Sequence, residues 1–218
     1  MTQEDPPRFA SIWVQQSGPV VEARHNLTSD QHQQAVSDFF NGGFRPACVS
    51  GYVIDGKAHF ASIWVKEDGP AMWERHNETT EQFQQACEEL YPQGFFPVSI
   101  SGYTVDNDPR FATIWTQADP EMRIDFRINQ DLTGYTDVAR VFGEHSVRPV
   151  SVASYPVGDG IRFAATWKLH TTSAWYYSLN KTHDDHQLVV NKWFGKGYRP
   201  VFIAAIPSTV YRACIPFG

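Results

Sequence analysis

The chain has 218 residues, of which 42% are hydrophobic, and a formal net charge of −6 at pH 7. This length is enough to bury a substantial core in one or two domains. The acidic balance and the lack of a basic stripe disfavour nucleic acid and anionic membrane surfaces as partners. No apolar run approaches the roughly 20 residues of a membrane span.

Residues 1–7 lack the basic and apolar regions of a signal peptide, so the chain as given is expected to be cytoplasmic. Secretion by an unconventional route, or as part of a longer secreted protein, stays open. Cys48, Cys87 and Cys214 agree with a reducing compartment, because they are odd in number and lack metal-ligand spacing.

A recurring pentapeptide sets the organisation of the chain. Phe-Ala-Ser-Ile-Trp and its variants occur at intervals of 51, 51 and 52 residues, at 9–13, 60–64, 111–115 and 163–167. The same register holds for four asparagines: Asn26, Asn77, Asn129 and Asn180. Self-similarity over this much of a sequence predicts tandem repeats.

Each unit is expected to contain three strands. One copy of the first strand runs from Arg45 to Tyr52, and the hairpin signal Asp55-Gly56 follows it. The pentapeptide forms the second strand, and its two largely apolar or small faces are typical of a sheet covered on both sides. Its tryptophans are interpreted as shared core residues: Trp13, Trp64, Trp115 and Trp167. After a turn at residues 68–70, a third strand is expected to return beside the second.

The third strand carries the candidate binding residues. One face is mostly apolar and is expected to point inward, with Met72, Glu74 and His76 in the second unit. The opposite face is expected to see solvent. Its candidate ligand-binding residues are Glu22, Arg24, Trp73, Arg75, Asp125, Arg127 and Tyr176. A flat ring or a planar guanidinium beside polar groups suits a sugar, but it equally suits a protein surface, and an ordinary solvated face stays open.

A capped amphipathic helix follows each third strand. Capping boxes are predicted for Thr28 with Gln31 and Thr79 with Gln82, with a weaker version at Thr182. Helix C-caps are expected at three glycines: Gly43, Gly94 and Gly197.

The unit is thus a three-stranded antiparallel meander plus one amphipathic helix, and the fold class is α+β. Four units of about 51 residues, near 8–59, 60–110, 111–162 and 163–215, are expected to form a single repeat domain over 1–218. The end segments, from Arg8 and over residues 210–215, are expected to cover the sheet edges.

Three segments taken together resemble a known family, called bacterial tandem repeat domain 1. They are Gly-Phe-Arg-Pro-Ala-Cys-Val-Ser-Gly-Tyr at 43–52, the pentapeptide at 60–64 and Trp-Glu-Arg-His-Asn at 73–77, and the resemblance covers about residues 8–215. The same repeats form the N-terminal domain of fungal polyglycine hydrolases, secreted serine proteases whose C-terminal domain resembles β-lactamase. The resemblance implies curved sheet, half-barrel or barrel-like, wrapped on helices, and an accessory or binding role. It supplies no catalytic residues in the repeats.

Two constellations could carry chemistry. Ser178-x-x-Lys181 has the letters of a β-lactamase-type nucleophile, but it straddles a strand end and a helix cap, so we interpret it as coincidental. His183 and His186 lack a second ligand cluster, and His25 and His76 are interpreted as partly buried histidines. No catalytic residue, metal site or cofactor is therefore predicted.

The sequence favours a non-catalytic binding module that is lectin-like, with related shallow sites acting through multivalency. The alternative is a protein-interaction or targeting domain related to the accessory domain of a β-lactamase-like serine hydrolase. Expected partners are a glycan or an extracellular peptide or protein ligand.

Overall fold

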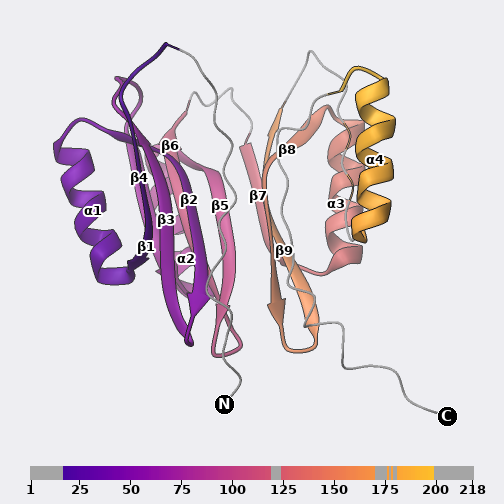
Figure 1. The fold of residues 1–218 in the computed structure, drawn as a ribbon, viewed down its shortest axis with the longest axis horizontal. Coiled ribbons are helices and arrows are strands. Elements are labelled where there is room, and N and C mark those ends of the chain that lie inside the picture. The colour runs from indigo at the N-terminus through magenta and orange to yellow at the C-terminus, as the bar shows by residue number, and fades with distance from the viewer. Residues whose placement is uncertain (1–16, 119–123, 170–175, 177, 179–180, 199–218) are drawn as a thin grey trace.

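The computed structural model describes residues 17–118, 124–169, 176, 178 and 181–198 (Figure 1). A strand, a helix and two further strands recur along the chain. The elements are β1 Val21–Thr28, α1 Ser29–Asn41, β2 Arg45–Ile54, β3 Lys57–Val65, β4 Met72–Glu78, α2 Thr80–Leu90, the 3₁₀ turn η1 Tyr91–Gln93, β5 Phe95–Val105, β6 Asp108–Gln117, β7 Ile124–Gln130, α3 Leu132–Glu144, β8 Val147–Val157, β9 Gly160–Leu169 and α4 His183–Gly195.

Three three-stranded antiparallel sheets are described, with strand orders β1-β3-β2, β4-β6-β5 and β7-β9-β8. We call the segments that hold them, 21–65, 72–117 and 124–169, the first, second and third repeats. Within each repeat a helix joins two strands that run in the same direction, and the third strand lies between them. The α+β class, the repeat and the antiparallel sheets are confirmed, and the described sheets do not close into a barrel.

The connections differ from the expected meander. The turn near residues 68–70 does not return the chain to the same sheet: β4 pairs with β6 instead of β3. The physical reason is that β3 already has β1 on one edge and β2 on the other, so neither edge is free. The supposed third strand is therefore the first strand of the following repeat.

The periodic asparagines mark a bulge in the first strand of each repeat. Asn26, Asn77 and Asn129 have φ values of 57°, 55° and 54°, and the strand register shifts at each of them. Asparagine tolerates this left-handed conformation better than most residues. The hydroxyl of Tyr155 accepts a hydrogen bond from the Asn129 backbone N–H at 3.0 Å and donates to Asn129 Oδ1 at 2.8 Å. Tyr52 accepts a hydrogen bond from the Asn26 backbone N–H at 2.9 Å, and Tyr103 donates to Asn77 Oδ1 at 3.3 Å, so the repeated tyrosine holds the bulge.

The repeated aromatic residues form the core, as expected. Trp64, Trp115 and Trp167 are fully buried, whereas Trp13 lies outside the described residues. A ring near the start of α1, α2 and α3 stacks or tilts on the pentapeptide phenylalanine of the same repeat; for example, Phe83 lies 5.5 Å from Phe111 between ring centroids. The interpretation of the central tryptophans as scaffold is confirmed for these three.

The helix ends also agree with the sequence. Both predicted capping boxes are present, at Thr28 and Thr79, and Thr182 accepts a hydrogen bond from the Asp185 backbone N–H. The predicted C-cap glycines have φ values between 76° and 84°. The expected edge-covering segments, from Arg8 and over 210–215, lie outside the described residues.

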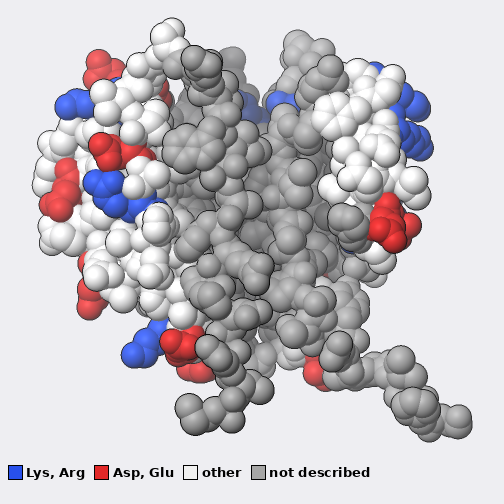
Figure 2. Space-filling view, in the orientation of Figure 1, with Lys and Arg blue, Asp and Glu red and all other residues white. Residues whose placement is uncertain are grey.

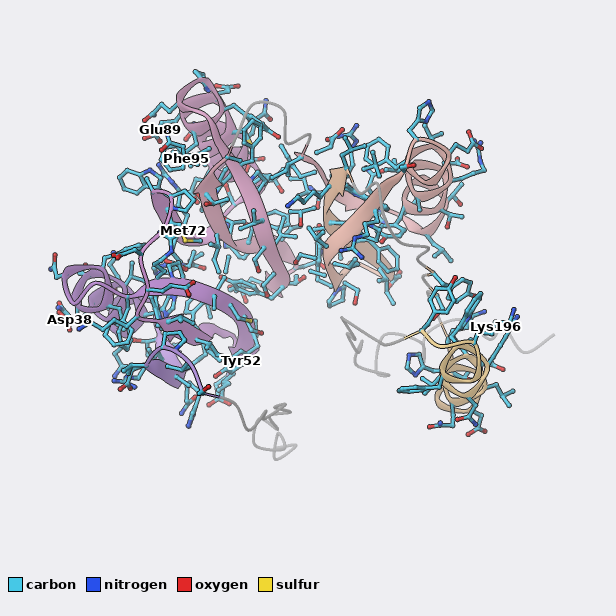
Figure 3. The ribbon with its side chains drawn as sticks, turned by 90° about the horizontal axis from the view of Figure 1, so that it is seen from above. Asp38, Tyr52, Met72, Glu89, Phe95 and Lys196 are labelled. Carbon is cyan, nitrogen blue, oxygen red and sulfur yellow. The ribbon has the colours of Figure 1, made fainter. Side chains whose placement is uncertain are left out.

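Successive repeats contact each other through a glycine and a tyrosine. A Cβ atom built on Gly51 would lie 2.2 Å from the Tyr103 ring of the next repeat, and one on Gly102 would lie 2.3 Å from the Tyr155 ring. Helices α1, α2 and α3 lie on the outer side of the molecule, with the strands toward its middle (Figures 1 and 3). None of the described helices has the length and apolar character to span a membrane.

Candidate functional site

The first strand of the second repeat lies between two helices, and this position creates two different surfaces. Viewed from above, Met72 at the start of β4 lies between Asp38 of α1 and Glu89 of α2 (Figure 3). Both helices contact β4. Because side chains alternate along a strand, one face of β4 meets α1 of the preceding repeat and the other meets α2 of its own repeat.

The face toward α2 carries Trp73 and Arg75, two of the predicted site residues. The Trp73 residue is 49% exposed, which is unusual for so large an apolar side chain. Arg75 Nη2 lies 2.6 Å from the Glu89 carboxylate of α2, in a charge-assisted hydrogen bond. A half-exposed indole, a guanidinium and a carboxylate therefore share this surface.

In the first and third repeats an acidic residue stands at the position of Trp73 and pairs with the arginine two residues later. Arg24 Nη1 lies 2.9 Å from Glu22 Oε2, and Arg127 pairs with Asp125. Each arginine also lies over a ring of its own helix: Arg24 over Phe39 at 5.0 Å, and Arg127 over a phenylalanine of α3 at 5.5 Å. The planar donors of this face are thus already engaged within the chain.

Tyr176 is the predicted residue of the fourth repeat, the unit expected from the sequence near residues 163–215. It is 48% exposed, and its ring stacks on Trp193 of α4 with 4.1 Å between centroids. Six of the seven predicted residues therefore lie at the same places on β1, β4 and β7, and in the described part of the chain the predicted residues do not converge on one pocket. On the face shown in Figure 2, described basic residues near α1 lie beside acidic ones, in agreement with such pairing.

The face of β4 toward α1 holds a buried polar cluster that the sequence did not predict as a unit. His32 Nε2 of α1 and His76 Nδ1 both lie 3.1 Å from Glu74, one on each carboxylate oxygen. The side chains of His32, Glu74 and His76 are 0%, 1% and 6% exposed. We call these residues the His-Glu-His cluster.

The electrostatics of the cluster favour an ionised Glu74. Burial opposes ionisation, but the hydrogen bonds from His32 and His76 outweigh it and hold the pKa of this carboxyl below its ordinary value. A carboxylate accepts and does not donate, so each imidazole donates through the nitrogen that faces it. The Nδ1 atom of His32 is buried and has no hydrogen-bond partner among the described residues.

Glu78, further along β4, has a contrasting environment. Burial raises its pKa to about 7, against the favourable charge of Arg75, and the Glu74 charge adds to the increase. One of its carboxylate oxygens is buried without a hydrogen-bond partner in the described part of the chain. The pKa values of two carboxyl groups on one strand are therefore shifted in opposite directions, because burial dominates at Glu78 whereas hydrogen bonds from two histidines outweigh it at Glu74.

Sequence reasoning placed Glu74 and His76 on the inward face of their strand but did not bring them together with His32. His76 was expected to be partly buried, which the structure confirms, whereas the same expectation for His25 is wrong, because His25 is exposed on β1. The three cluster residues meet because β4 belongs to the next sheet and lies against the preceding helix. The expected meander placed β4 in another sheet, so it hid this contact.

The remaining sequence candidates stay apart from these surfaces. Ser178 and Lys181 both precede the α4 N-cap Thr182, so they do not share a helical turn. His186 is partly buried on α4. A cavity of about 330 Å³, lined mainly by apolar side chains that include Val98, Ile124 and Val150, lies between the second and third repeats.

Comparison with known families decides what kind of repeat this is. A family model described as "Polyglycine hydrolase-like, structural repeat" (BTRD1) matches residues 18–67, 69–118, 148–168 and 172–212. The chain belongs to this family. The first two matches each contain one described sheet with its helix, and the resemblance seen in the sequence is confirmed.

Membership in the polyglycine hydrolase-like repeat family supports a non-catalytic repeat domain. A search of curated proteins finds no match to the chain. The identity of any ligand must therefore be argued from the surfaces themselves.

Proposed function

We propose that this chain is a recognition module whose repeats bind carbohydrate in a lectin-like manner, at the outward face of the first strands. The observation that carries the proposal is the half-exposed Trp73 ring beside the Arg75–Glu89 ion pair. This group is built on a strand and a helix, so its spacing is held by the fold.

The three groups have complementary chemistry for a sugar. The apolar face of a pyranose ring can stack on an indole, while its hydroxyls accept from a guanidinium and donate to a carboxylate. Arg75 is fixed by Glu89, which lowers the conformational entropy that binding would cost. Because the surface is shallow, one such site would bind weakly, and Tyr176 on the fourth repeat would add a second contact through multivalency.

The chain supplies its own matched control for this site. Position 73 is equivalent to Glu22 and Asp125 in the neighbouring repeats, where an acidic residue pairs with the arginine two positions later. Trp73→Glu should therefore remove the ring and leave the local fold intact. Glu22→Gln, which leaves Trp73 untouched, is the control for a general change of surface charge.

The test is a glycan array followed by titration of any sugar that binds. We expect Trp73→Glu to weaken binding by at least about tenfold, which corresponds to about 1.4 kcal/mol, with Glu22→Gln unchanged. Absence of binding to any glycan, or binding that is equal in wild type and Trp73→Glu, would count against the proposal.

A second candidate is peptide recognition, and it is favoured by the position of β4 at the edge of its sheet. An edge strand presents unpaired backbone groups that can bind an extended peptide. The family description names polyglycine hydrolases, so a glycine-rich peptide, which has only backbone groups to offer, is the first probe. Binding of such a peptide without glycan binding would favour this candidate.

A further inference from the structure

We propose that His32, Glu74 and His76 bind a divalent transition-metal ion, with Zn²⁺ as the best match, where α1 of the first repeat meets β4 of the second. Two imidazoles and one carboxylate form a donor set that suits Zn²⁺ and leaves a coordination position for water. The inference does not depend on carbohydrate binding, because these residues lie on the opposite face of β4 from Trp73.

The geometry already brings the donors together. One ligand atom from each of the three residues lies within 4.8 Å of the others, and each imidazole is 3.1 Å from the carboxylate. Zn–N and Zn–O bonds are about 2.0–2.2 Å long, so an ion between them requires the more distant donor atoms to move closer together. His76 is the most exposed of the three and marks the side from which an ion would enter.

The ring packing orients the imidazoles. The His32 ring stacks on Phe60 at 5.0 Å, and the His76 ring meets Phe60 edge-on at 4.9 Å. The His32 and His76 rings themselves lie 4.7 Å apart, nearly perpendicular. Both histidines are therefore held in place by the core, so little rotamer freedom remains to be lost when an ion binds.

The burial of the cluster makes the facing donor atoms available to an ion and not to bulk solvent. The Glu74 side chain is 1% exposed and has an imidazole nitrogen at each of its two oxygens. Burial of a carboxyl group is costly unless its partners are well placed. His32 Nε2 and His76 Nδ1, the two nitrogens that face this carboxyl group, are the atoms that would bind an ion together with it.

We call the contact of α1 with β4 the first boundary and the contact of α2 with β7 the second boundary. The second boundary shows that the fold does not require these polar residues. There the equivalent positions hold Phe83, Phe126 and Ile128, and the two phenylalanine rings lie 5.3 Å apart. The same backbone arrangement is thus filled by apolar side chains. All three positions carry metal-ligand residue types at the first boundary, which a structural role alone does not explain.

The test measures Zn²⁺ binding to the full chain after treatment with a chelator. We expect equilibrium dialysis to show one tightly held ion per chain. The midpoint of thermal unfolding should rise by about 5 to 10 °C when free Zn²⁺ is about one hundredfold above Kd. Affinity should fall as the pH is lowered, because the imidazoles must be neutral to bind.

The matched site variant is His32→Phe/Glu74→Phe/His76→Ile, which copies the second boundary. It should fold and lose both the bound ion and the thermal shift, whereas His145→Gln, at an exposed histidine on the third repeat, should keep both. If the triple variant does not fold, His76→Ile alone, read by the visible absorption of bound Co²⁺, replaces it. No bound ion in wild type, or equal binding in the site variants, would overturn the proposal.

Discussion

The two repeat boundaries use the same backbone but different chemistry. At the first, α1 meets β4 through the buried His-Glu-His cluster. At the second, α2 meets β7 through Phe83 and Phe126, which belong to an aromatic cluster with Phe111 and Trp115. The strand order and the asparagine bulge are the same in both repeats.

The comparison of the two boundaries distinguishes features that the fold requires from features that vary between repeats. Ring packing and the glycine–tyrosine contact are common to both boundaries, so they belong to the scaffold. Hydrogen-bonded charge occurs at the first boundary and not at its described counterpart. A buried ionic group contributes less to stability than apolar packing of similar volume. Stability alone therefore does not account for the His-Glu-His cluster, and a functional role is favoured.

The largest effect is expected from the shared contact. Gly51→Ala and Gly102→Ala each place a Cβ atom within 2.3 Å of a buried tyrosine ring of the next repeat. Overpacking of this kind should cost about 3 kcal/mol in the free energy of unfolding, and similarly at both boundaries. Urea denaturation measures it.

The control for these variants is Ser154→Ala. Ser154 occupies the position of Gly51 and Gly102 in the third repeat and already carries a Cβ atom. Its substitution should change stability by less than about 0.5 kcal/mol. Strong destabilisation by Gly102→Ala together with no effect of Gly51→Ala would show that the two boundaries do not share a scaffold.

Most of the scaffold could be predicted from the sequence because its signals are local. The hairpins after Tyr52 and Tyr103, the helix caps and the buried pentapeptide follow from turn chemistry, capping and side-chain alternation. The pairing of strands with one another was harder to predict from the sequence. Nothing local to residues 72–78 shows that β3 already has two neighbours, so the meander was a reasonable but wrong expectation.

The candidate surfaces were also predictable only where they depend on local sequence. The exposure of Trp73 follows from strand alternation, which is local. The contact of His32 with Glu74 joins residues 42 positions apart and depends on the packing of one repeat on the next. A comparison of equivalent positions could have indicated it, because His32, Glu74 and His76 replace apolar residues together.

A pH-dependent difference between the repeats is expected at Glu78, which corresponds to Gln130 in the third repeat. Burial raises the pKa of Glu78 from 4.5 to about 7, so the protonated form favours the fold. Its favourable contribution is complete below about pH 4.5 and is lost as the pH rises through 7. Glu78→Gln should therefore stabilise the chain by about 2 to 3 kcal/mol at pH 8 and leave it nearly unchanged at pH 4.5.

Urea denaturation at the two pH values, with a chelator present, measures this difference. The exposed Glu88→Gln serves as the control for a lost surface charge. At pH 4.5 Glu78 is expected to be protonated, and a protonated carboxyl group and an amide should be nearly equivalent there. An equal gain in stability from Glu78→Gln at both pH values would therefore contradict the pKa argument.

The smallest effect concerns the tryptophan of the third repeat. Trp64 and Trp115 each donate their indole N–H to a hydroxyl two residues earlier, on Ser62 and Thr113, at 2.9 Å. Ala165 replaces that hydroxyl in the third repeat, and the buried Nε1 of Trp167 has no partner among the described residues. Ala165→Ser should supply it and stabilise the chain by about 1 kcal/mol, read as a rise of about 2 to 4 °C in Tm. Ala164→Ser places the hydroxyl on the opposite, apolar face and should destabilise instead, so a gain from both variants would show that the indole hydrogen bond is not the cause.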